Sequence, residues 1–214
     1  MLFILGFYIF AGPSHYPIRV VAVQGVYSHV SPHDIQKIID PSAKRGYFFL
    51  RLCLLQRKLE EKLPWVESAT VTREWPDKLI ITLTEREAVA TLNHRFLVTS
   101  AGSIFQPAPD TFPPGLFHLL GPKEKVVDLL NNYRLLASIA DAAQLSLAEL
   151  ELSPEGDWRV NLSNKTVVML GNNDILIRFE RFIKIYQNIF IPQHREPKYV
   201  DMRYSHGMAV NWQT

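Results

Sequence analysis

Hydrophobic and polar positions in the first part of the chain follow the pattern of a β-α-α-β-β unit. Residues 18–23 (IRVVAV) are rich in β-branched side chains, which favour a strand. A short helix is predicted from Ser31 to Ile39, because Ser31-Pro32 is a favourable helix start and Asp40-Pro41-Ser42 a favourable stop. Leucine recurs at helical spacing within residues 52–63, which predicts a second helix. Two further strands are predicted at residues 66–73 and 78–85, joined by a turn at Trp75-Pro76-Asp77.

A second region with a different pattern begins near Glu87. Two longer amphipathic segments predict helices at residues 123–143 and 174–191. Short alternating segments predict strands at residues 88–92, 95–99, 116–120, 147–152, 158–162, 166–170, 198–204 and 208–212. We therefore expect an α+β chain, with a first domain at residues 16–86 and, at residues 87–214, a domain of mostly antiparallel sheet with two packed helices.

The last two predicted strands form a hairpin at the end of the chain, with its turn at Ser205-His206-Gly207. The final run, MAVNWQT, contains no charged residue and no proline. At a sheet edge such a strand could accept a partner strand through main-chain hydrogen bonds; the alternative is a central strand that is already paired on both sides. Trp212 must pack either on the sheet of its own domain or on a partner, and the sequence leaves both possibilities open.

Large aromatic side chains are expected mostly in the core or in turns, and they are Phe48, Phe49, Trp65, Trp75, Trp158 and Trp212. The single cysteine, Cys53, is expected to be a small buried residue, and one cysteine cannot form an internal disulfide. On the last predicted helix, Arg178, Arg181 and Lys184 are expected to lie outside the buried stripe.

The sequence shows no pattern of catalytic or metal-binding residues. A net charge of +2 over 214 residues lacks the basic excess of a dedicated nucleic-acid-binding protein. His29 and His33 have a metal-like spacing, but the helix start between them favours an exposed pair without a metal site. Glu85 and Glu87 could serve a cell-wall glycosidase, which nothing else in the sequence supports. We expect no catalytic residue, no cofactor and no metal.

The first eleven residues (MLFILGFYIFA) are uncharged and almost entirely apolar. A membrane-spanning helix needs about 20 such residues, so this stretch is too short by itself. No basic leader precedes it, as a signal peptide would require. We interpret residues 1–12 as the outer end of an incomplete membrane anchor; the alternatives are an unusual but complete N-terminus or a buried first strand.

Two runs of residues carry a resemblance to a known family. The first is residues 71–79 (VTREWPDKL), preceded by Trp65-Val66 and followed by Thr84-Glu85-Arg86-Glu87. The second is residues 199–212 (YVDMRYSHGMAVNW), and Leu170-Gly171 with the region around Arg178 also fits. In order and spacing the chain, from about Tyr16 onward, resembles the FtsQ/DivIB family of bacterial division proteins, in which a POTRA domain precedes a β-domain.

The resemblance implies a non-catalytic scaffold, anchored in the bacterial inner membrane by one helix, with most of the chain in the periplasm at the division septum. Such a protein would bind the small coiled-coil division proteins FtsB and FtsL. It would contact other divisome and septal cell-wall synthesis proteins, and would help to recruit and regulate septal peptidoglycan synthesis. FtsB would add a strand at the C-terminal edge of the β-domain, and no nucleic acid would be bound.

Carried over by motif, the partner contacts on the β-domain would be Arg203, Tyr204, Ser205, Gly207 and Trp212. Arg203 would pair with an acidic partner side chain, and Tyr204 and Trp212 would be the main anchors. Gly207 would allow the turn and a close backbone approach. His206 departs from the small or acidic residue that is common at this position.

In the POTRA domain the resemblance implies further contacts at Ser68, Val71 and Arg73, although Val71 also fits an ordinary core position. An alternative function is that of a POTRA-containing protein in an outer-membrane or secretion assembly system. Those proteins usually carry POTRA repeats and a membrane β-barrel. One POTRA-like unit followed by a helix-containing domain argues against that alternative.

Overall fold

The structure, a computed structural model, describes residues 17–25, 28–43, 46–193, 196–205 and 207–212. Residues 1–12, interpreted as the end of a membrane anchor, and His206 lie outside the described residues. The chain divides into two compact units between Glu87 and Ala88. Within the described ranges, no helix has the length and hydropathy that crossing a bilayer requires.

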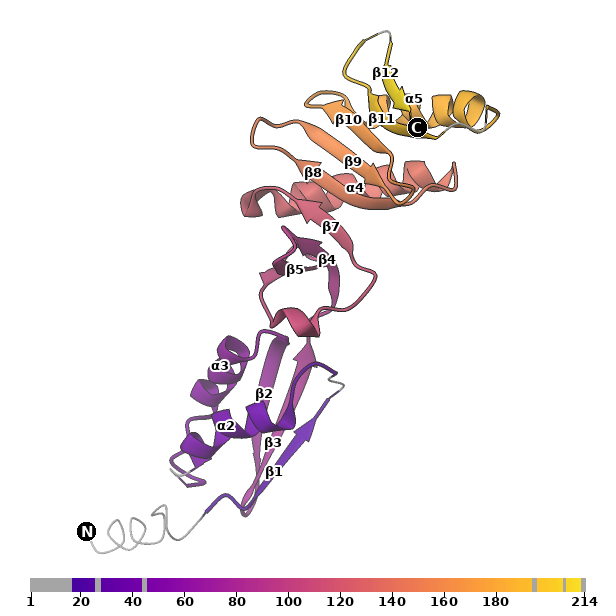
Figure 1. Ribbon diagram of the computed structural model, residues 1–214. Coiled ribbons are helices and arrows are strands. Elements are labelled where there is room, and N and C mark those ends of the chain that lie inside the picture. Colours follow the sequence, from indigo (N-terminus) through magenta and orange to yellow (C-terminus); the bar gives the residue numbers. More distant parts are fainter. Residues whose placement is uncertain (1–16, 26–27, 44–45, 194–195, 206, 213–214) are drawn as a thin grey trace, which may run out of the picture. The chain divides into compact units, whose positions relative to one another are not determined.

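In the first unit two helices pack against a three-stranded sheet (Figure 1). The elements follow the predicted order: β1 (Val20–Gln24), α2 (Pro32–Ala43), α3 (Leu52–Lys62), β2 (Val66–Glu74) and β3 (Lys78–Glu85). The strand order is β1-β3-β2, with β1 parallel and β2 antiparallel to β3. Apolar side chains from both layers form the core, and the fully buried ones include Ile35, Leu55, Leu59, Leu79 and Ile81.

The first helix does not end at Asp40-Pro41-Ser42, as the sequence predicted. Helix α2 continues through Pro41 to Ala43. Because Pro41 lies in the last turn, its missing N–H removes only one intrahelical hydrogen bond. The burial of Ile39 and Ser42 holds that turn against the rest of the unit.

In the second unit the chain forms one nine-stranded sheet with two main helices (Figure 1). Its elements are β4 (Ala88–Leu92), β5 (Phe96–Thr99), β6 (Ile104–Phe105), β7 (Phe117–Leu120), α4 (Val126–Asp141), β8 (Leu147–Leu152), β9 (Trp158–Leu162), β10 (Val167–Gly171), α5 (Ile175–Ile185), β11 (Pro197–Asp201) and β12 (Ala209–Trp212). Short helical turns are η1 (Pro109–Thr111), η2 (Lys123–Lys125) and η3 (Tyr186–Phe190), the last being a π-helical turn that continues α5.

The strand order in this sheet is β12-β11-β10-β9-β8-β7-β4-β5-β6. Five of the eight pairings among the described strands are antiparallel, and β10–β11, β8–β7 and β7–β4 are parallel. The α+β class, with a mostly antiparallel sheet and two packed helices, is therefore confirmed. Helices α4 and α5 share one core with the sheet, in which Leu129, Leu136, Phe179 and Phe182 are fully buried.

The large aromatic side chains lie in the core or in turns, as predicted, but the burial of Cys53 differs from the prediction. Trp65 and Trp158 are buried, and Phe48 and Phe49 lie in a turn, where they are about half exposed. Cys53 is also exposed, because Leu55 and Leu59 form the buried stripe of α3 and Cys53 lies on another side of the helix.

Candidate protein-binding site

Strand β12 is an edge of the nine-stranded sheet. It pairs antiparallel with β11, where Val210 lies opposite Val200 and Ala209 opposite Asp201. Among the strands that the structure describes, none lies on its other side. Of the two alternatives that the sequence left open for the terminal strand, the structure therefore shows an edge strand among the strands that it describes.

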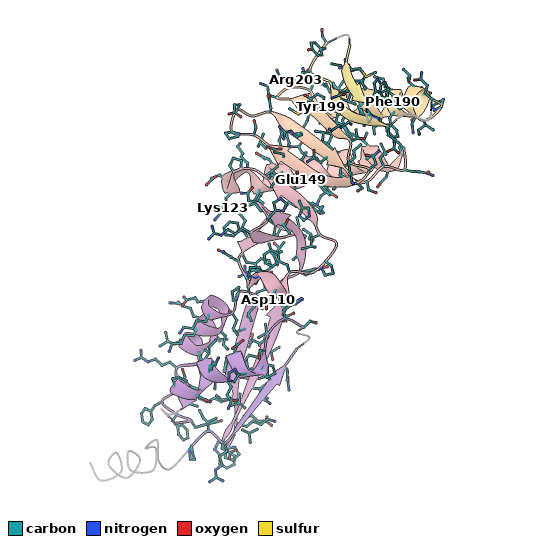
Figure 2. All side chains as sticks on the ribbon, viewed as in Figure 1. Asp110, Lys123, Glu149, Phe190, Tyr199 and Arg203 are labelled. Atoms are coloured by element: carbon teal, nitrogen blue, oxygen red, sulfur yellow. The ribbon has the colours of Figure 1, made fainter. Side chains whose placement is uncertain are left out.

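Side chains of β12 alternate between the core and solvent. Ala209 and Asn211 are exposed, whereas Val210 and Trp212 are half-buried and pack against the core. The ring of Trp212 lies edge-on to Phe190, with the centroids 5.3 Å apart and the ring planes at 80°. Figure 2 labels Phe190 in this part of the unit. Trp212 therefore packs on the core of its own domain.

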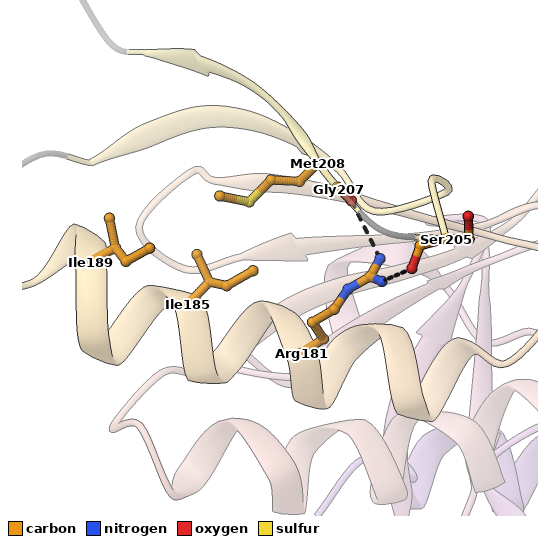
Figure 3. Close-up of a pocket in the computed structure, with 6 residues that line it drawn as sticks. All are labelled: Arg181, Ile185, Ile189, Ser205, Gly207 and Met208. Carbon is orange, nitrogen blue, oxygen red and sulfur yellow. Dashed lines mark hydrogen bonds between the residues drawn. The ribbon is translucent and has the colours of Figure 1, made fainter.

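The turn before β12 is held by an arginine of helix α5. Arg181 donates from Nη1 to the carbonyl oxygen of Ser205 at 2.7 Å. It donates from Nη2 to the carbonyl oxygens of Met202, Tyr204 and Gly207 at 3.0, 2.7 and 3.5 Å. Figure 3 shows the guanidinium beneath the turn. One cation thus holds four carbonyl groups around this turn, and charged donors form the stronger hydrogen bonds.

As predicted, Arg178 and Arg181 lie outside the buried stripe of α5, which is formed by Phe179, Phe182 and Ile183. Both arginines are only partly exposed, and Arg178 donates to the carbonyl oxygen of Leu170. The acceptors of Arg181 are 21 to 26 residues away in sequence, so no local pattern could have revealed them.

Arg203 already has an acidic partner within the chain. Its Nη2 donates to Oδ2 of Asp201 at 2.7 Å, and its Nε and backbone N–H both donate to Oδ1 at 3.0 Å. These hydrogen bonds lower the pKa of Asp201 below its ordinary value, against the opposing effect of burial. The side chain of Arg203 is still 48% exposed, so the guanidinium can be reached from solvent. Figure 2 labels Arg203 on the terminal hairpin.

The other predicted contact residues lie on the same turn. The side chain of Tyr204 is exposed, at 58%, and Ser205 and Gly207 are exposed as well. A Cβ added at Gly207 would meet open space, and its φ lies outside the left-handed region. The turn itself therefore does not require glycine at this position.

A groove runs between α5 and the turn that leads into β12. Its volume is about 420 Å³. The lining residues are Arg181, Ile185, Ile189, Ser205, Gly207 and Met208 (Figure 3). Its walls are mainly apolar, since two isoleucines and a methionine face one another across it. Sequence reasoning missed the groove, because its two walls come from segments that are distant in the chain.

The predicted contacts in the first unit do not form one surface. Ser68 and Arg73 on β2 are exposed, but Val71 between them is only 4% exposed and belongs to the core. Arg73 donates from Nε to the carbonyl oxygen of Tyr47 at 2.8 Å, and from Nη2 to that of Leu50. Arg73 therefore has a structural role, since it ties the α2–α3 loop to β2.

Glu85 is also a structural residue. Its carboxylate accepts hydrogen bonds from the backbone N–H groups of Ser28, His29 and Val30 at 2.9 to 3.0 Å. The ring of His29 stacks on Trp65, with the centroids 3.9 Å apart. Through these hydrogen bonds Glu85 fixes the position of the segment that follows β1. In the part of the chain that the structure describes, no group of three or more histidine, cysteine or acidic side chains is placed to hold a metal.

These hydrogen bonds predict an acid-sensitive contribution to stability. Burial alone would raise the pKa of Glu85, but the hydrogen bonds from the backbone and His29 lower it below its ordinary value of 4.5. The carboxylate thus stabilises the first unit at neutral pH, and this contribution is lost as the pH falls below 4.5 through the lowered pKa.

We expect Glu85→Gln to lower the free energy of unfolding at pH 7 by about 1–3 kcal/mol, the range for a buried group that loses a charged hydrogen-bond partner. Denaturant titrations of parent and variant should show a difference that shrinks in acid. Glu67→Gln, at an exposed position of β2, is the matched control and should change little. A difference that stays constant below pH 4 would contradict the assignment.

Two family profiles match the chain. Residues 16–86 match the profile described as POTRA domain, FtsQ-type, and residues 88–203 match that described as cell division protein FtsQ/DivIB, C-terminal. The chain belongs to the FtsQ/DivIB family. The matches cover both units, and the family predicted from the WPD-L turn and the terminal hairpin is confirmed. The second match ends at Arg203, so the family profile does not cover the rest of the hairpin.

Curated relatives agree with the profiles. The chain is similar to the cell division protein FtsQ of Shewanella oneidensis, with 32% identity over 218 residues, covering 98% of this chain and 82% of the relative. It is similar to FtsQ of Coxiella burnetii, with 30% identity over 200 residues, covering 94% and 82%. FtsQ of Escherichia coli K12 is 28% identical over 201 residues, covering 92% and 73%.

FtsQ/DivIB proteins are non-catalytic scaffolds of bacterial cell division. The chain is therefore a division protein of the septum and not an enzyme, and it works with other proteins of the divisome. The hypothesis of a cell-wall glycosidase is excluded by this family, and Glu85, one of its two carboxylates, is held by backbone hydrogen bonds instead.

Proposed function

We propose that this chain is an inner-membrane divisome scaffold that binds FtsB and FtsL, with FtsB adding a β-strand to β12, and that it thereby helps to recruit and regulate septal peptidoglycan synthesis. In this proposal residues 1–12 are the end of the membrane anchor, residues 16–86 are the POTRA domain and residues 87–214 are the partner-binding β-domain. Both domains lie in the periplasm.

The open edge of β12 is the observation that carries the proposal. Soluble proteins usually protect such edges with lysine, proline, a bulge or a covering segment. Residues 209–212 (AVNW) include no charge and no proline, and among the described residues no strand pairs with their outer side. An added strand would form main-chain hydrogen bonds along the outer side of β12, which is how β-augmentation gives affinity.

The alternation along β12 indicates which partner side chains fit. A strand added beside β12 would place every second side chain on the helix-covered face, next to Val210 and Trp212. On that face α5 presents Ile185 and Ile189 toward the hairpin. We therefore expect apolar partner residues at every second position, with polar residues between them beside Ala209 and Asn211.

The turn supplies the specific contacts. Tyr204 is an exposed aromatic side chain on a segment that Arg181 holds in place. A partner that binds Tyr204 therefore does not pay the conformational entropy of ordering this segment. Arg203 can add a contact to an acidic partner side chain, but it shares its charge with Asp201. We therefore expect this contact to contribute less binding free energy than the same contact made by an unpaired arginine.

Binding to the periplasmic part of the FtsB–FtsL pair tests the proposal. We expect Tyr204→Ala to weaken binding by about 2 kcal/mol, roughly 30-fold, as truncation of an interface anchor does. Leu135→Ala, which removes another exposed apolar side chain on α4, is the matched control and should bind as the parent does. Calorimetric titration of folded variants gives the affinities. No binding by the parent chain would reject the proposed partners, and equal binding by Tyr204→Ala would reject the turn as the site.

A further inference from the structure

We propose that one end of the first unit, formed by the α2–α3 loop and the β2–β3 turn, lies in the headgroup region of a phospholipid bilayer, with Phe48, Phe49 and Trp75 in contact with lipid. We call this end the aromatic end. The inference rests on the proposed membrane anchoring, and it adds a second contact with the bilayer that the folded domain itself makes.

Three large aromatic side chains are exposed at the aromatic end. Trp75 is 76% exposed, Phe48 is 48% exposed and Phe49 is 47% exposed. By contrast, Trp65 in the same unit is 4% exposed. Clustered exposed apolar side chains mark interaction surfaces. Tryptophan concentrates where a bilayer meets water, because its ring combines an apolar body with a polar N–H.

The structure brings the two aromatic segments together. Arg73 lies two residues before Trp75 on β2, and its guanidinium donates to the carbonyl oxygens of Tyr47, Phe48 and Leu50. The α2–α3 loop is therefore fastened to the strand that leads into the turn. Figure 1 shows both segments at the same end of the first unit.

The chain also enters the first unit at the aromatic end. The backbone N–H of Arg19 donates to the carbonyl oxygen of Asp77, in the β2–β3 turn, at 3.0 Å. Val20, the first residue of β1, lies opposite Lys78, directly after that turn. The polypeptide that precedes β1 therefore begins from the same end as Trp75.

The length of this connection limits the distance to the membrane. The apolar run ends at Ala11, and Arg19 follows eight residues later. A fully extended chain covers at most about 3.6 Å per residue, so Arg19 lies within roughly 30 Å of the point where the anchor leaves the bilayer. Of the surfaces of the first unit, the aromatic end is the one that this short connection holds beside the membrane.

Charge at the aromatic end suits lipid phosphates. Arg19 is mostly exposed, and Arg51, directly before α3, is exposed. The acidic residues beside the β2–β3 turn are paired, Asp77 with Arg19 at 3.9 Å and Glu74 with Lys78 at 2.8 Å. Basic residues beside aromatic ones match the layer in which phosphates border acyl chains. We therefore assign the bilayer as the occupant of this surface.

Brominated lipids test the inference, because bromine quenches only tryptophan that reaches the lipid. The full chain is reconstituted into phosphatidylethanolamine–phosphatidylglycerol vesicles, with or without bromine on the acyl chains, and flotation first shows whether it is membrane-bound. We expect floated parent chain to be quenched by brominated lipid and Trp75→Phe to lose most of that quenching. Trp158→Phe, which replaces a buried tryptophan of the second unit, is the matched control and should retain it.

The outcomes separate this inference from the membrane anchoring on which it rests. A chain that floats but whose Trp75 emission is not quenched would overturn the lipid contact and leave the anchor intact. A chain that does not float would contradict the lipid contact of the folded domain, but not the proposed anchoring, because residues 1–12 are too short to span a bilayer by themselves. If Trp75 becomes shielded from a soluble quencher only when the FtsB–FtsL pair is added, the surface belongs to a protein partner and the lipid contact is wrong. Circular dichroism checks that Trp75→Phe remains folded, as its exposed position predicts.

Discussion

Trp212→Ala is expected to lower the free energy of unfolding of the second unit by about 3 kcal/mol, the lower end of the range for truncating a packed tryptophan. Trp212 lies edge-on to Phe190, which is only 1% exposed, and together they close the core at the end of the sheet. Truncation would leave a cavity beside Phe190 and loosen β12 from the helix-covered face.

Tyr204→Ala is the matched comparison for stability. Its side chain projects from the turn into solvent, so truncation should change the free energy of unfolding by no more than about 0.5 kcal/mol. Denaturant titrations followed by circular dichroism compare both variants with the parent. If Trp212→Ala were as stable as the parent, the packing on Phe190 would contribute little, and Trp212 would again be a candidate anchor for the partner.

This difference changes how binding data on the two residues are interpreted. A loss of partner binding in Trp212→Ala can arise from a distorted β12 as well as from a lost contact, because Trp212 holds the strand on its own core. A loss in Tyr204→Ala has no such structural contribution. Tyr204 therefore reports on the interface more directly, although the family resemblance implied similar roles for both.

Local patterns were sufficient for most secondary structure. The strands at residues 78–85, 88–92, 147–152 and 158–162 have the predicted bounds, because alternation and flanking turn residues lie within each segment. The two-residue strand β6 was not predicted, since only its pairing with β5 defines it. The π-helical turn η3 at the end of α5 likewise carries no signal in the hydrophobic periodicity.

The site depends on arrangements that no local pattern specifies. The sequence predicted a terminal hairpin but could not place β12 at the edge, because strand order is set by pairings between distant segments. The carbonyl groups in the turn that accept hydrogen bonds from Arg181 lie more than twenty residues after it in the sequence. The pairing of Arg203 with Asp201, by contrast, is local, because Asp201 ends β11 and Arg203 follows two residues later. This pairing could have been considered from the sequence.

A proline in β12 should have the largest effect on partner binding. Successive residues of a strand direct their N–H groups to opposite sides, so of Val210 and Asn211 one faces β11 and the other faces the open edge. Proline at the outward-facing position removes a donor and places its ring against an incoming strand, while the β11–β12 ladder is kept. Losing two or more ladder hydrogen bonds of about 1 kcal/mol each predicts binding weakened roughly 30- to 100-fold.

A side-by-side comparison of Val210→Pro and Asn211→Pro shows whether a partner strand adds to β12. Denaturant titration, with Val210→Ala and Asn211→Ala as references for the lost side chains, identifies the variant in which proline itself costs no stability, which is the one with proline facing outward. Calorimetric titration with the periplasmic FtsB–FtsL pair then measures its affinity. We expect this variant to be stable and folded and to bind at least about 30-fold more weakly than the parent. If that variant binds as tightly as the parent, no strand is added to this edge and the proposed strand addition is wrong.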